Sequence, residues 1–239
     1  MTPVRCPIVE LRRYTLHPGQ RDVLIDLFDR EFVESQEALG MAILGQFRDL
    51  DDADRFVWLR GFDDMPGRAE ALGRFYGGPV WKAHSREANA TMVDSDDVLL
   101  LRPAEGSTGF PAPAEPRPPA GHTEPPQSLV VATICHRDRP VDDEFGDLFM
   151  NRLRPALAEA GGPPLACLQT EFAENTFPAL PVRVGEHVFV WFTRFGTAAD
   201  HDEYRHRRDR GEPWRDLLAT LARPPEHLRL APTARSLLR

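Results

Sequence analysis

Two distant stretches of this chain carry the same pattern, 56–58 and 189–191, which both read Phe-Val-Trp. In each stretch a further phenylalanine follows four residues beyond the tryptophan. A second match, Pro79-Val80-Trp81 against Pro213-Trp214, comes after each stretch in the same order. Matched segments in matched order indicate an internal repeat. We therefore expect the chain to fold as two similar halves.

A proline-rich stretch separates these halves. Eight of the 23 prolines lie between Pro103 and Pro126, among several glycines and small polar residues. Proline fixes φ and removes a backbone donor, so such a stretch forms neither a helix nor a central strand. We interpret 103–126 as an extended surface linker. It leaves an N-terminal domain over 1–102 and a C-terminal domain over 127–239.

The first half shows the periodicities of an α+β unit. Glu10 to Tyr14 alternates apolar and polar residues, which is typical of a half-buried strand. Leu24, Phe28 and Phe32 recur at helical spacing, and Gly40 is suited to end that helix. We predict strands over 8–16, 41–47, 55–62 and 98–101, with helices ahead of Gly40 and over 65–76.

The second half repeats that order. We predict strands over 129–135, 165–172, 187–195 and 226–230, with helices over 142–160 and 200–210. Pro155 lies inside the first of these helices and is expected to kink or shorten it. Both halves then read βαββαβ, which is the ferredoxin-like order. A four-stranded sheet with helices on one face must bury its other face, so two half-domains in one chain can close sheet to sheet into an α/β barrel.

Composition narrows the classes of partner. The net charge of -8 and the lack of an isolated basic block leave no electrostatic footprint for nucleic acid. No apolar run approaches the length of a membrane span, and residues 1–6 lack the apolar core of a secretory signal. Cys6, Cys135 and Cys167 are far apart, and the last two lie in apolar runs as buried thiols would. We expect a cytoplasmic protein, and the single lysine, Lys82, among 29 basic residues suggests a bacterial host of high GC content.

Two segments resemble a known family. Glu10-Leu11-Arg12-Arg13-Tyr14, followed by Pro18-Gly19, resembles the opening strand and turn of NIPSNAP proteins. Residues 174–186, running into Val188-Phe189-Val190-Trp191, resemble the long hairpin of tandem bacterial members. The resemblance implies the dimeric α/β-barrel superfamily, which includes monooxygenases, isomerases, dehydratases and heme proteins. It implies a site inside the barrel or between a sheet and its helices, and no single reaction.

The first half supplies the candidate catalytic residues. Arg12 and Tyr14 share one strand face, so Arg12 is suited to clamp an anion and Tyr14 to donate to a carbonyl or phenolate. His84 follows a glycine-rich turn and is the candidate base. The alternative is that Tyr14 is a core aromatic and His84 an exposed or capping histidine. The candidate ligand-binding aromatics are Trp58, Tyr76 and Trp81.

The second half supplies further candidate ligand-binding residues, namely Asn175, Arg183, Trp191 and Trp214. The segment 174–186 is long for a hairpin connection, and long loops are usually functional or disordered. It is expected either to cover a pocket or to pack as an arm against the other half or a second chain.

Three functions remain open. The first is an enzyme or binding protein that holds a small hydrophobic, aromatic molecule in an apolar cavity, with oxidation or isomerisation as the reaction. The chain has no dinucleotide, P-loop or serine-hydrolase motif, so that reaction would use no dinucleotide. The second is a heme protein with His84 or His201 as axial ligand, although no motif predicts a metal or cofactor. The third is a scaffold that docks a partner, or another copy of the chain in a homo-oligomer, through 174–186.

Overall fold

The computed structural model describes residues 6–239. The expectation about a secretory signal therefore falls largely outside the described residues. The first half contains the strands β1 (Ile8–Leu16), β2 (Ala42–Asp49), β3 (Arg55–Phe62) and β4 (Met92–Pro103). Its helical segments are α1 (Arg21–Leu27), the π-helical η1 (Phe28–Phe32), α2 (Val33–Glu37), α3 (Met65–Tyr76) and α4 (Pro79–Thr91).

The second half repeats this order. Its strands are β5 (Leu129–His136), β6 (Pro164–Thr170), β7 (Val188–Phe195) and β8 (Glu226–Pro232). Its helical segments are α5 (Asp143–Asp147), η2 (Leu148–Leu153), α6 (Arg154–Glu159), α7 (Ala198–Arg208) and α8 (Glu212–Ala219). Pro155 sits at the start of α6, directly after the π-helical turns of η2, so the helix changes its winding there.

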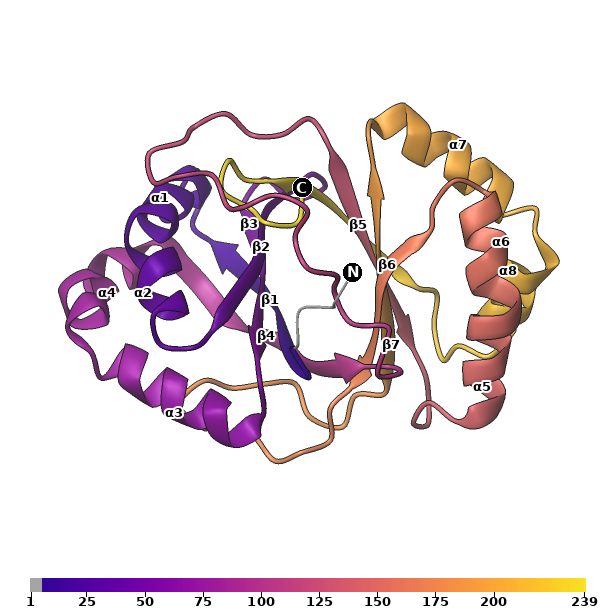
Figure 1. Ribbon diagram of the computed structural model, residues 1–239, viewed down its shortest axis with the longest axis horizontal. Helices are drawn as coiled ribbons and strands as arrows, with labels where there is room; N and C mark the ends of the chain where they lie inside the picture. The colour runs from indigo at the N-terminus through magenta and orange to yellow at the C-terminus, as the bar shows by residue number, and fades with distance from the viewer. Residues whose placement is uncertain (1–5) are drawn as a thin grey trace.

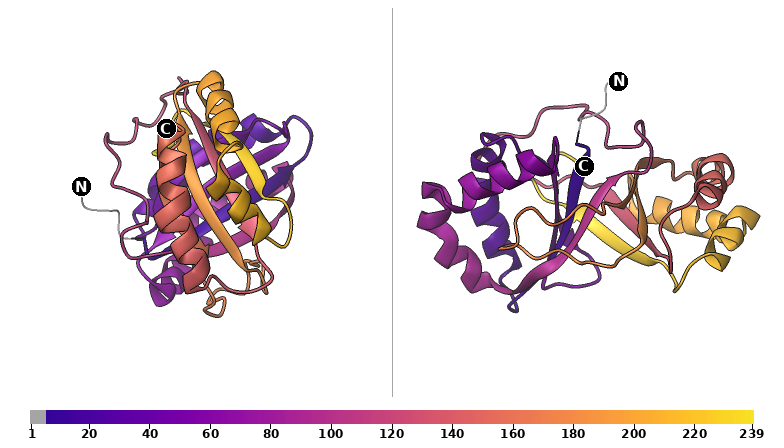
Figure 2. Two further views of the ribbon diagram at one scale, coloured as in Figure 1. Left: turned by 90° about the vertical axis from the view of Figure 1, so that its right-hand side faces the viewer. Right: turned by 90° about the horizontal axis from the view of Figure 1, so that it is seen from below.

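The eight strands form one closed barrel in the order β1-β3-β2-β8-β5-β7-β6-β4. Each half contributes four neighbouring antiparallel strands in equivalent order, and the halves join at β2–β8 and β4–β6. The helices of the first half cover one side of the barrel and those of the second half the opposite side (Figures 1 and 2). The predicted pair of ferredoxin-like halves closed as an α/β barrel is confirmed.

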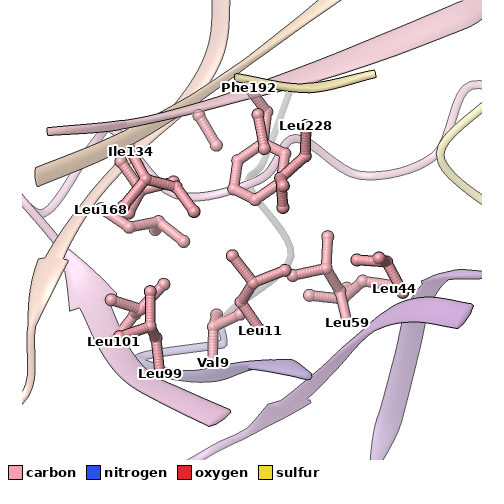
Figure 3. Close-up of a cluster of buried hydrophobic side chains, with 14 of the residues drawn as sticks. Val9, Leu11, Leu44, Leu59, Leu99, Leu101, Ile134, Leu168, Phe192 and Leu228 are labelled. Atoms are coloured by element: carbon pink, nitrogen blue, oxygen red, sulfur yellow. The ribbon is translucent and has the colours of Figure 1, made fainter. Parts of the chain in front are cut away.

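The barrel encloses one apolar core to which both halves contribute (Figure 3). Val9, Leu11 and Leu59 meet Ile134 and Phe192 across it. Two further cores lie outside the barrel, one between each four-stranded sheet and its own helices. Every central strand is therefore buried on both faces, and any charge on such a strand must find a partner.

Three expectations about elements need correction. Residues 79–91 and 212–219 form helices α4 and α8, which the sequence analysis did not predict. Both begin with a proline at the first helical positions, where its missing N–H costs nothing. The strand expected over 98–101 is longer, because β4 begins at Met92 and ends at Pro103.

The linker is more than a surface connection. Phe110 is buried in the barrel core against Phe192, with ring centroids 5.0 Å apart. Arg117 donates to the Glu37 carboxylate at 2.7 Å, which ties the linker to α2. Cys6, Cys135 and Cys167 are free and buried. Within residues 6–239, no helix combines the length and apolar character that crossing a bilayer requires.

Candidate functional site

A charged row on β1 lies between the sheet of the first half and its helices. Glu10, Arg12 and Tyr14 occupy alternate positions, so they share one face of the strand. Their direct neighbours across the ladder are Arg60, Trp58 and Phe56 on β3. These residues thus form a polar and aromatic patch inside an otherwise apolar layer.

Glu10 accepts hydrogen bonds from three arginines. Its Oε2 atom lies 2.9 Å from Arg12 Nη1 and 2.6 Å from Arg60 Nη2, and its Oε1 atom lies 2.7 Å from Arg68 Nε. Arg68 comes from α3, so the cluster joins a helix to two strands. All four side chains are 0% exposed. Burial acts to raise the pKa of Glu10, but the attraction of Arg60, Arg12 and Arg68 outweighs burial and lowers that pKa well below its usual range.

Arg12 also holds the hydroxyl of Tyr14. The Arg12 Nε atom donates to the Tyr14 hydroxyl oxygen at 3.0 Å, and the guanidinium lies 5.4 Å from the centroid of the Tyr14 ring. Burial raises the pKa of Tyr14, and the attraction of Arg12 opposes burial without cancelling it. Tyr14 is thus a neutral phenol whose oxygen is already accepting one bond, so its own proton is available to another acceptor.

Tyr14 also lines a small cavity of about 30 Å³. The side chains at its wall that carry an oxygen atom are Tyr14, Tyr76 and Gln36, and Gln36 Oε1 accepts from Arg60 Nη1 at 3.0 Å. The remaining wall is aromatic or aliphatic and comes from the helices and strands of the first half: Leu24, Phe28, Phe32, Trp58, Phe75, Trp81, Ala88 and Met92. A volume of this size holds about one water molecule.

The structure brings five of the predicted first-half residues together. Trp58, Tyr76 and Trp81 line the cavity with Tyr14, and Arg12 lies behind Tyr14. The Trp81 ring packs against Tyr76, with centroids 4.8 Å apart.

His84 does not belong to this group. It is a member of α4 with a side chain that is 28% exposed, and its ring nitrogens face Glu31 at 3.5 Å and Glu87 at 3.9 Å. It is not among the residues that line the cavity. The structure therefore separates the expected base from Tyr14 and Arg12, because the His84 ring lies at the edge of Phe32, with centroids 6.4 Å apart, and Phe32 stands at the cavity wall.

The segment between β6 and β7, residues 171–187, reaches across to α3 of the first half and is called the arm below (Figures 1 and 2). Asn175 Oδ1 accepts from Arg68 Nη1 at 3.0 Å. The Phe177 ring stacks on Tyr76 with centroids 5.9 Å apart. Asn175 thus lies on the charged cluster and not in the cavity wall. The arm therefore packs against the other half, and its Phe177 lies on Tyr76 of the cavity wall.

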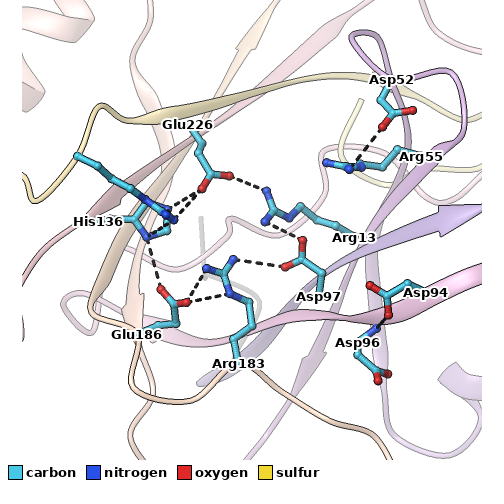
Figure 4. A network of polar contacts seen from close by, with 11 residues as sticks. Arg13, Asp52, Arg55, Asp94, Asp96, Asp97, His136, Arg183, Glu186 and Glu226 are labelled. Atoms are coloured by element: carbon cyan, nitrogen blue, oxygen red, sulfur yellow. Dashed lines mark hydrogen bonds and ion pairs between the residues drawn. The ribbon is translucent and has the colours of Figure 1, made fainter.

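Arg183 lies elsewhere, in a ring of ion pairs at one end of the barrel (Figure 4). Its guanidinium lies 3.3 Å from Asp97 Oδ1 and 2.5 Å from Glu186 Oε1. The ring alternates basic and acidic side chains from both halves, in the order Arg13, Asp97, Arg183, Glu186, His136 and Glu226. Arg183 therefore fastens the root of the arm to β4 and is not part of the cavity.

The second half has no charged residue at the three equivalent strand positions. The ladder between β5 and β7 places Val131, Thr133 and Cys135 where β1 has Glu10, Arg12 and Tyr14. Trp191 and Trp214 pack edge to face in the second-half core, with centroids 6.3 Å apart. His201 is buried between Phe195 and Tyr204 in the same half.

Four residues of the first-half site were not predicted, namely Glu10, Gln36, Arg60 and Arg68. A signal for two of them exists in the sequence, because Glu10 and Arg60 are charges within apolar strand patterns. Once both faces of these strands are expected to be buried, such charges must be paired inside the protein. No comparable signal marks Gln36 and Arg68, which come from helices.

Comparison with protein families matches residues 9–108 to the NIPSNAP family. No curated protein sequence matches the chain. Among solved structures, a protein of Fusobacterium nucleatum described as a "putative monooxygenase" is 10% identical, with 98% of this chain and 94% of that chain covered and a TM-score of 0.58. A protein of Lactobacillus acidophilus with the same description is 12% identical over 95% and 94% of the two chains, at 0.55. An anthrone oxidase-like protein is 13% identical over 95% and 91%, at 0.52. The TM-scores establish a shared fold, and at identities this low the comparison extends to the fold alone.

Proposed function

Residues 9–108 of this chain match the model of the NIPSNAP family, and from this match we propose that the first half binds a small aromatic molecule between its sheet and its helices. The observation that carries the proposal is the Tyr14 hydroxyl, which Arg12 holds at 3.0 Å beside a cavity with aromatic walls. Binding sites for small molecules are mostly apolar with a few placed polar groups, and this site has that composition.

Tyr14 would recognise an oxygen atom of the ligand. Its proton is free to be donated because its oxygen accepts from Arg12. A buried phenol backed by a guanidinium stabilises negative charge on a carbonyl or phenolic oxygen. The structures described as monooxygenases and as anthrone oxidase-like share this fold, and they support a small organic molecule as the class of ligand.

The cavity wall offers no carboxylate or imidazole as a general base. Isomerisation needs such a base within hydrogen-bond reach of the proton that it removes. His84, the expected base, faces Glu31 and Glu87 instead. The arrangement therefore favours binding and charge stabilisation, and an oxidation would have to draw its oxidant from solution.

Entry of an aromatic ligand requires the cavity to widen. Pockets for molecules of drug size have volumes of about 300–1,000 Å³, whereas this one has about 30 Å³. Tyr76 and Trp81 are only partly buried, and Tyr76 is covered by Phe177 of the arm. Movement of these rings would open the site. A heme would need a far larger rearrangement than a two-ring ligand.

Isothermal titration calorimetry with 2-naphthamide, a neutral aromatic probe with one carbonyl, tests this proposal. Wild-type protein should bind the probe, and Tyr14→Phe should weaken binding about 5- to 10-fold, since one hydrogen bond is lost. Tyr204→Phe is the matched control, because Tyr204 is the buried tyrosine of the second half. Equal binding by Tyr14→Phe and wild type, or no binding by wild type, would contradict the proposal.

The scaffold function keeps one specific observation in its favour. Phe172 and Val184 of the arm are 53% and 83% exposed, while Phe177 packs on the first half. Replacing both exposed residues with serine should abolish co-purification of any partner that docks there, and it should leave binding of 2-naphthamide intact.

A further inference from the structure

The charged cluster holds more positive charge than the chain neutralises. Arg12, Arg60 and Arg68 are each bonded to Glu10, which is the only carboxylate within ion-pair distance of any of them among residues 6–239. Three guanidinium groups and one carboxylate leave a net charge of about +2 in a region with no exposure to solvent. Buried charges without a counter-charge are strongly disfavoured.

Of the three arginines, Arg68 has a guanidinium group with an unfilled hydrogen-bond position. Its Nη2 atom is buried and has no hydrogen-bond acceptor within the described part of the chain. Its Nη1 atom donates to two neutral oxygens of the arm, Asn175 Oδ1 at 3.0 Å and Thr176 Oγ1 at 3.3 Å. The outer edge of this guanidinium, the edge suited to bind a carboxylate with two parallel hydrogen bonds, therefore meets neutral groups.

Aromatic rings account for only part of the compensation. The Arg60 guanidinium lies 4.9 Å from the centroid of the Trp58 ring, and that of Arg68 lies 5.9 Å from the Phe62 centroid. A ring face attracts a cation less strongly than a carboxylate does when both are buried. The rings do not provide a hydrogen-bond acceptor for the Arg68 Nη2 atom.

We propose that Arg68 is the subsite for the carboxylate of an aromatic acid, and that Asn175 occupies this subsite when no ligand is bound. The carboxylate would displace the Asn175 side chain and engage both Nη atoms of Arg68. This inference rests on the proposed function, and it names the ligand class as anionic. The second half thereby takes part in a site whose other groups all belong to the first half.

The arm is built so that it can lift away. Residues 171–187 contain no helix or strand, and both roots are fixed by backbone bonds to β4, from Glu171 N to Leu100 O at 2.9 Å and from Arg183 N to Val98 O at 2.8 Å. Between its roots the arm touches α3 at two places. Asn175 and Thr176 contact the first turn of α3, and Phe177 contacts Tyr76 at the last turn of α3. Lifting this middle part uncovers Arg68 and Tyr76 together.

The two ends of the site lie close enough for one ligand. The Arg12 guanidinium bonds Tyr14 at 3.0 Å and Glu10 at 2.9 Å, and Glu10 bonds Arg68 at 2.7 Å. One guanidinium and one carboxylate thus separate the Tyr14 hydroxyl from Arg68. A ligand that spans the site would place its ring in the cavity and its carboxylate on Arg68.

The test compares 6-hydroxy-2-naphthoate with 6-hydroxy-2-naphthamide, which share a ring system and a hydroxyl group for Tyr14 and differ in charge. By calorimetry, wild-type protein should bind 6-hydroxy-2-naphthoate at least about 10-fold more tightly, because a charged bidentate contact replaces a neutral one. Asn175→Asp places a resident carboxylate on Arg68 and should abolish this preference. Asn151→Asp, the same change at an exposed position of η2, should retain it. Equal binding of both probes by wild type, or a preference that survives Asn175→Asp, would overturn the inference while leaving the proposed function standing.

Thermal melting without ligand supplies an independent readout. Asn175→Asp supplies the missing counter-charge and gives up the bond from Asn175 Nδ2 to Leu180 O, and we expect the counter-charge to outweigh that bond, so its Tm should rise by about 2–4 °C relative to wild type. An unchanged or lower Tm would mean that Arg68 does not require an anion and would overturn the inference, even if neither probe bound. Failure of both probes to bind, with the Tm rise observed, would instead contradict the proposed function.

Discussion

At the scale of single residues, Glu10 organises the buried charges of the first half. It is bonded to three arginines and lies on the strand that also carries Tyr14. Removing one charge from a buried cluster destabilises the fold by more than the net stabilisation that the ion pair provides, because the remaining charges stay buried without compensation. The position is thus far more sensitive to neutralisation than to loss of volume.

Glu10→Gln should lower the free energy of unfolding by about 3–5 kcal/mol, since three buried guanidinium groups lose their only carboxylate. Urea denaturation followed by circular dichroism measures this change. Glu31→Gln is the control, because its ion pair with Arg30 is partly exposed and such pairs contribute less than about 1 kcal/mol. If the two variants lose similar amounts of stability, the cluster is not electrostatically strained.

Asp29 on η1 makes the stability of the protein fall as the pH rises. Burial raises the pKa of Asp29 to about 6, and the attraction of Arg235 and Arg117 opposes burial without cancelling it. A carboxyl group whose pKa is higher in the folded state binds its proton more tightly there. Its protonated form thus stabilises the fold fully below the unfolded pKa near 4, and this contribution is lost as the pH rises through about 6.

Asp29→Asn should therefore be more stable than wild type at pH 8, by roughly 3 kcal/mol at most, and close to it at pH 4. The side-chain oxygen that accepts from Gln46 Nε2 at 2.9 Å is retained in the variant. Urea denaturation of both proteins at the two pH values measures the difference. A stability gap that does not widen between pH 4 and pH 8 would show that Asp29 is charged without penalty.

At the scale of elements, the strands could be predicted because their signals are local. Arg55–Phe62 was predicted to the residue, since its phenylalanine and tryptophan spacing recurs in β7. The proline-rich linker could be expected for the same reason, as proline acts on its own residue, although its first residue, Pro103, ends β4. The insertion of Phe110 into the core could not be predicted, because it depends on a partner, Phe192, in the other half.

Helices α4 and α8 were missed because their beginnings look like turns. Gly77-Gly78-Pro79 precedes α4 and Gly211-Glu212-Pro213 begins α8, and both combinations are also typical of loops. The helical alternative has its own physical basis, since proline is favoured in the first turn. Missing α4 had a consequence for the site, because a helix fixes the direction in which His84 points.

The candidate site was predicted in part. Arg12, Tyr14 and Trp58 were identified because they lie on predicted strands, Tyr76 because it ends the helix predicted over 65–76, and Trp81 because it follows that helix closely. The presence of Arg68 and Gln36 at the site depends on how helices pack over the sheet, and no local sequence pattern predicts that packing. Trp191 and Trp214 repeat the first-half pattern, but Val131 and Thr133 take the strand positions of Glu10 and Arg12. The charge beside Trp214 is Arg208 of α7, whose guanidinium lies 4.1 Å from the centroid of the Trp214 ring.

At the scale of the whole molecule, the two halves share one fold but differ in the residues that they place between sheet and helices. The first half retains the charged row on β1, and the second half has apolar or small residues at the equivalent positions. The second half contributes the arm, whose Asn175 reaches Arg68. The duplication therefore explains how one chain can build a single asymmetric site from two similar sheets.

The barrel should also make both halves unfold together. Its core contains Val9 and Leu11 from the first half and Ile134 and Phe192 from the second, and neither sheet buries these residues alone. An apolar sheet face left open to water is unfavourable, so separating the halves would expose the largest shared apolar surface of the molecule. The ring of ion pairs in Figure 4 joins the same strands at one end of the barrel.

Leu11→Ala and Ile134→Ala test this coupling from opposite halves. Each should lower the free energy of unfolding by about 2–5 kcal/mol, because each leaves a cavity in the common core. Each should also displace one single transition, seen at the same urea concentration by far-UV circular dichroism and by tryptophan fluorescence. Val184→Ala, at an exposed position of the arm, should leave that transition in place. Two separate transitions, with each mutation displacing only the one belonging to its own half, would mean that the halves are independent domains that touch, and that the shared core adds little to the stability of either.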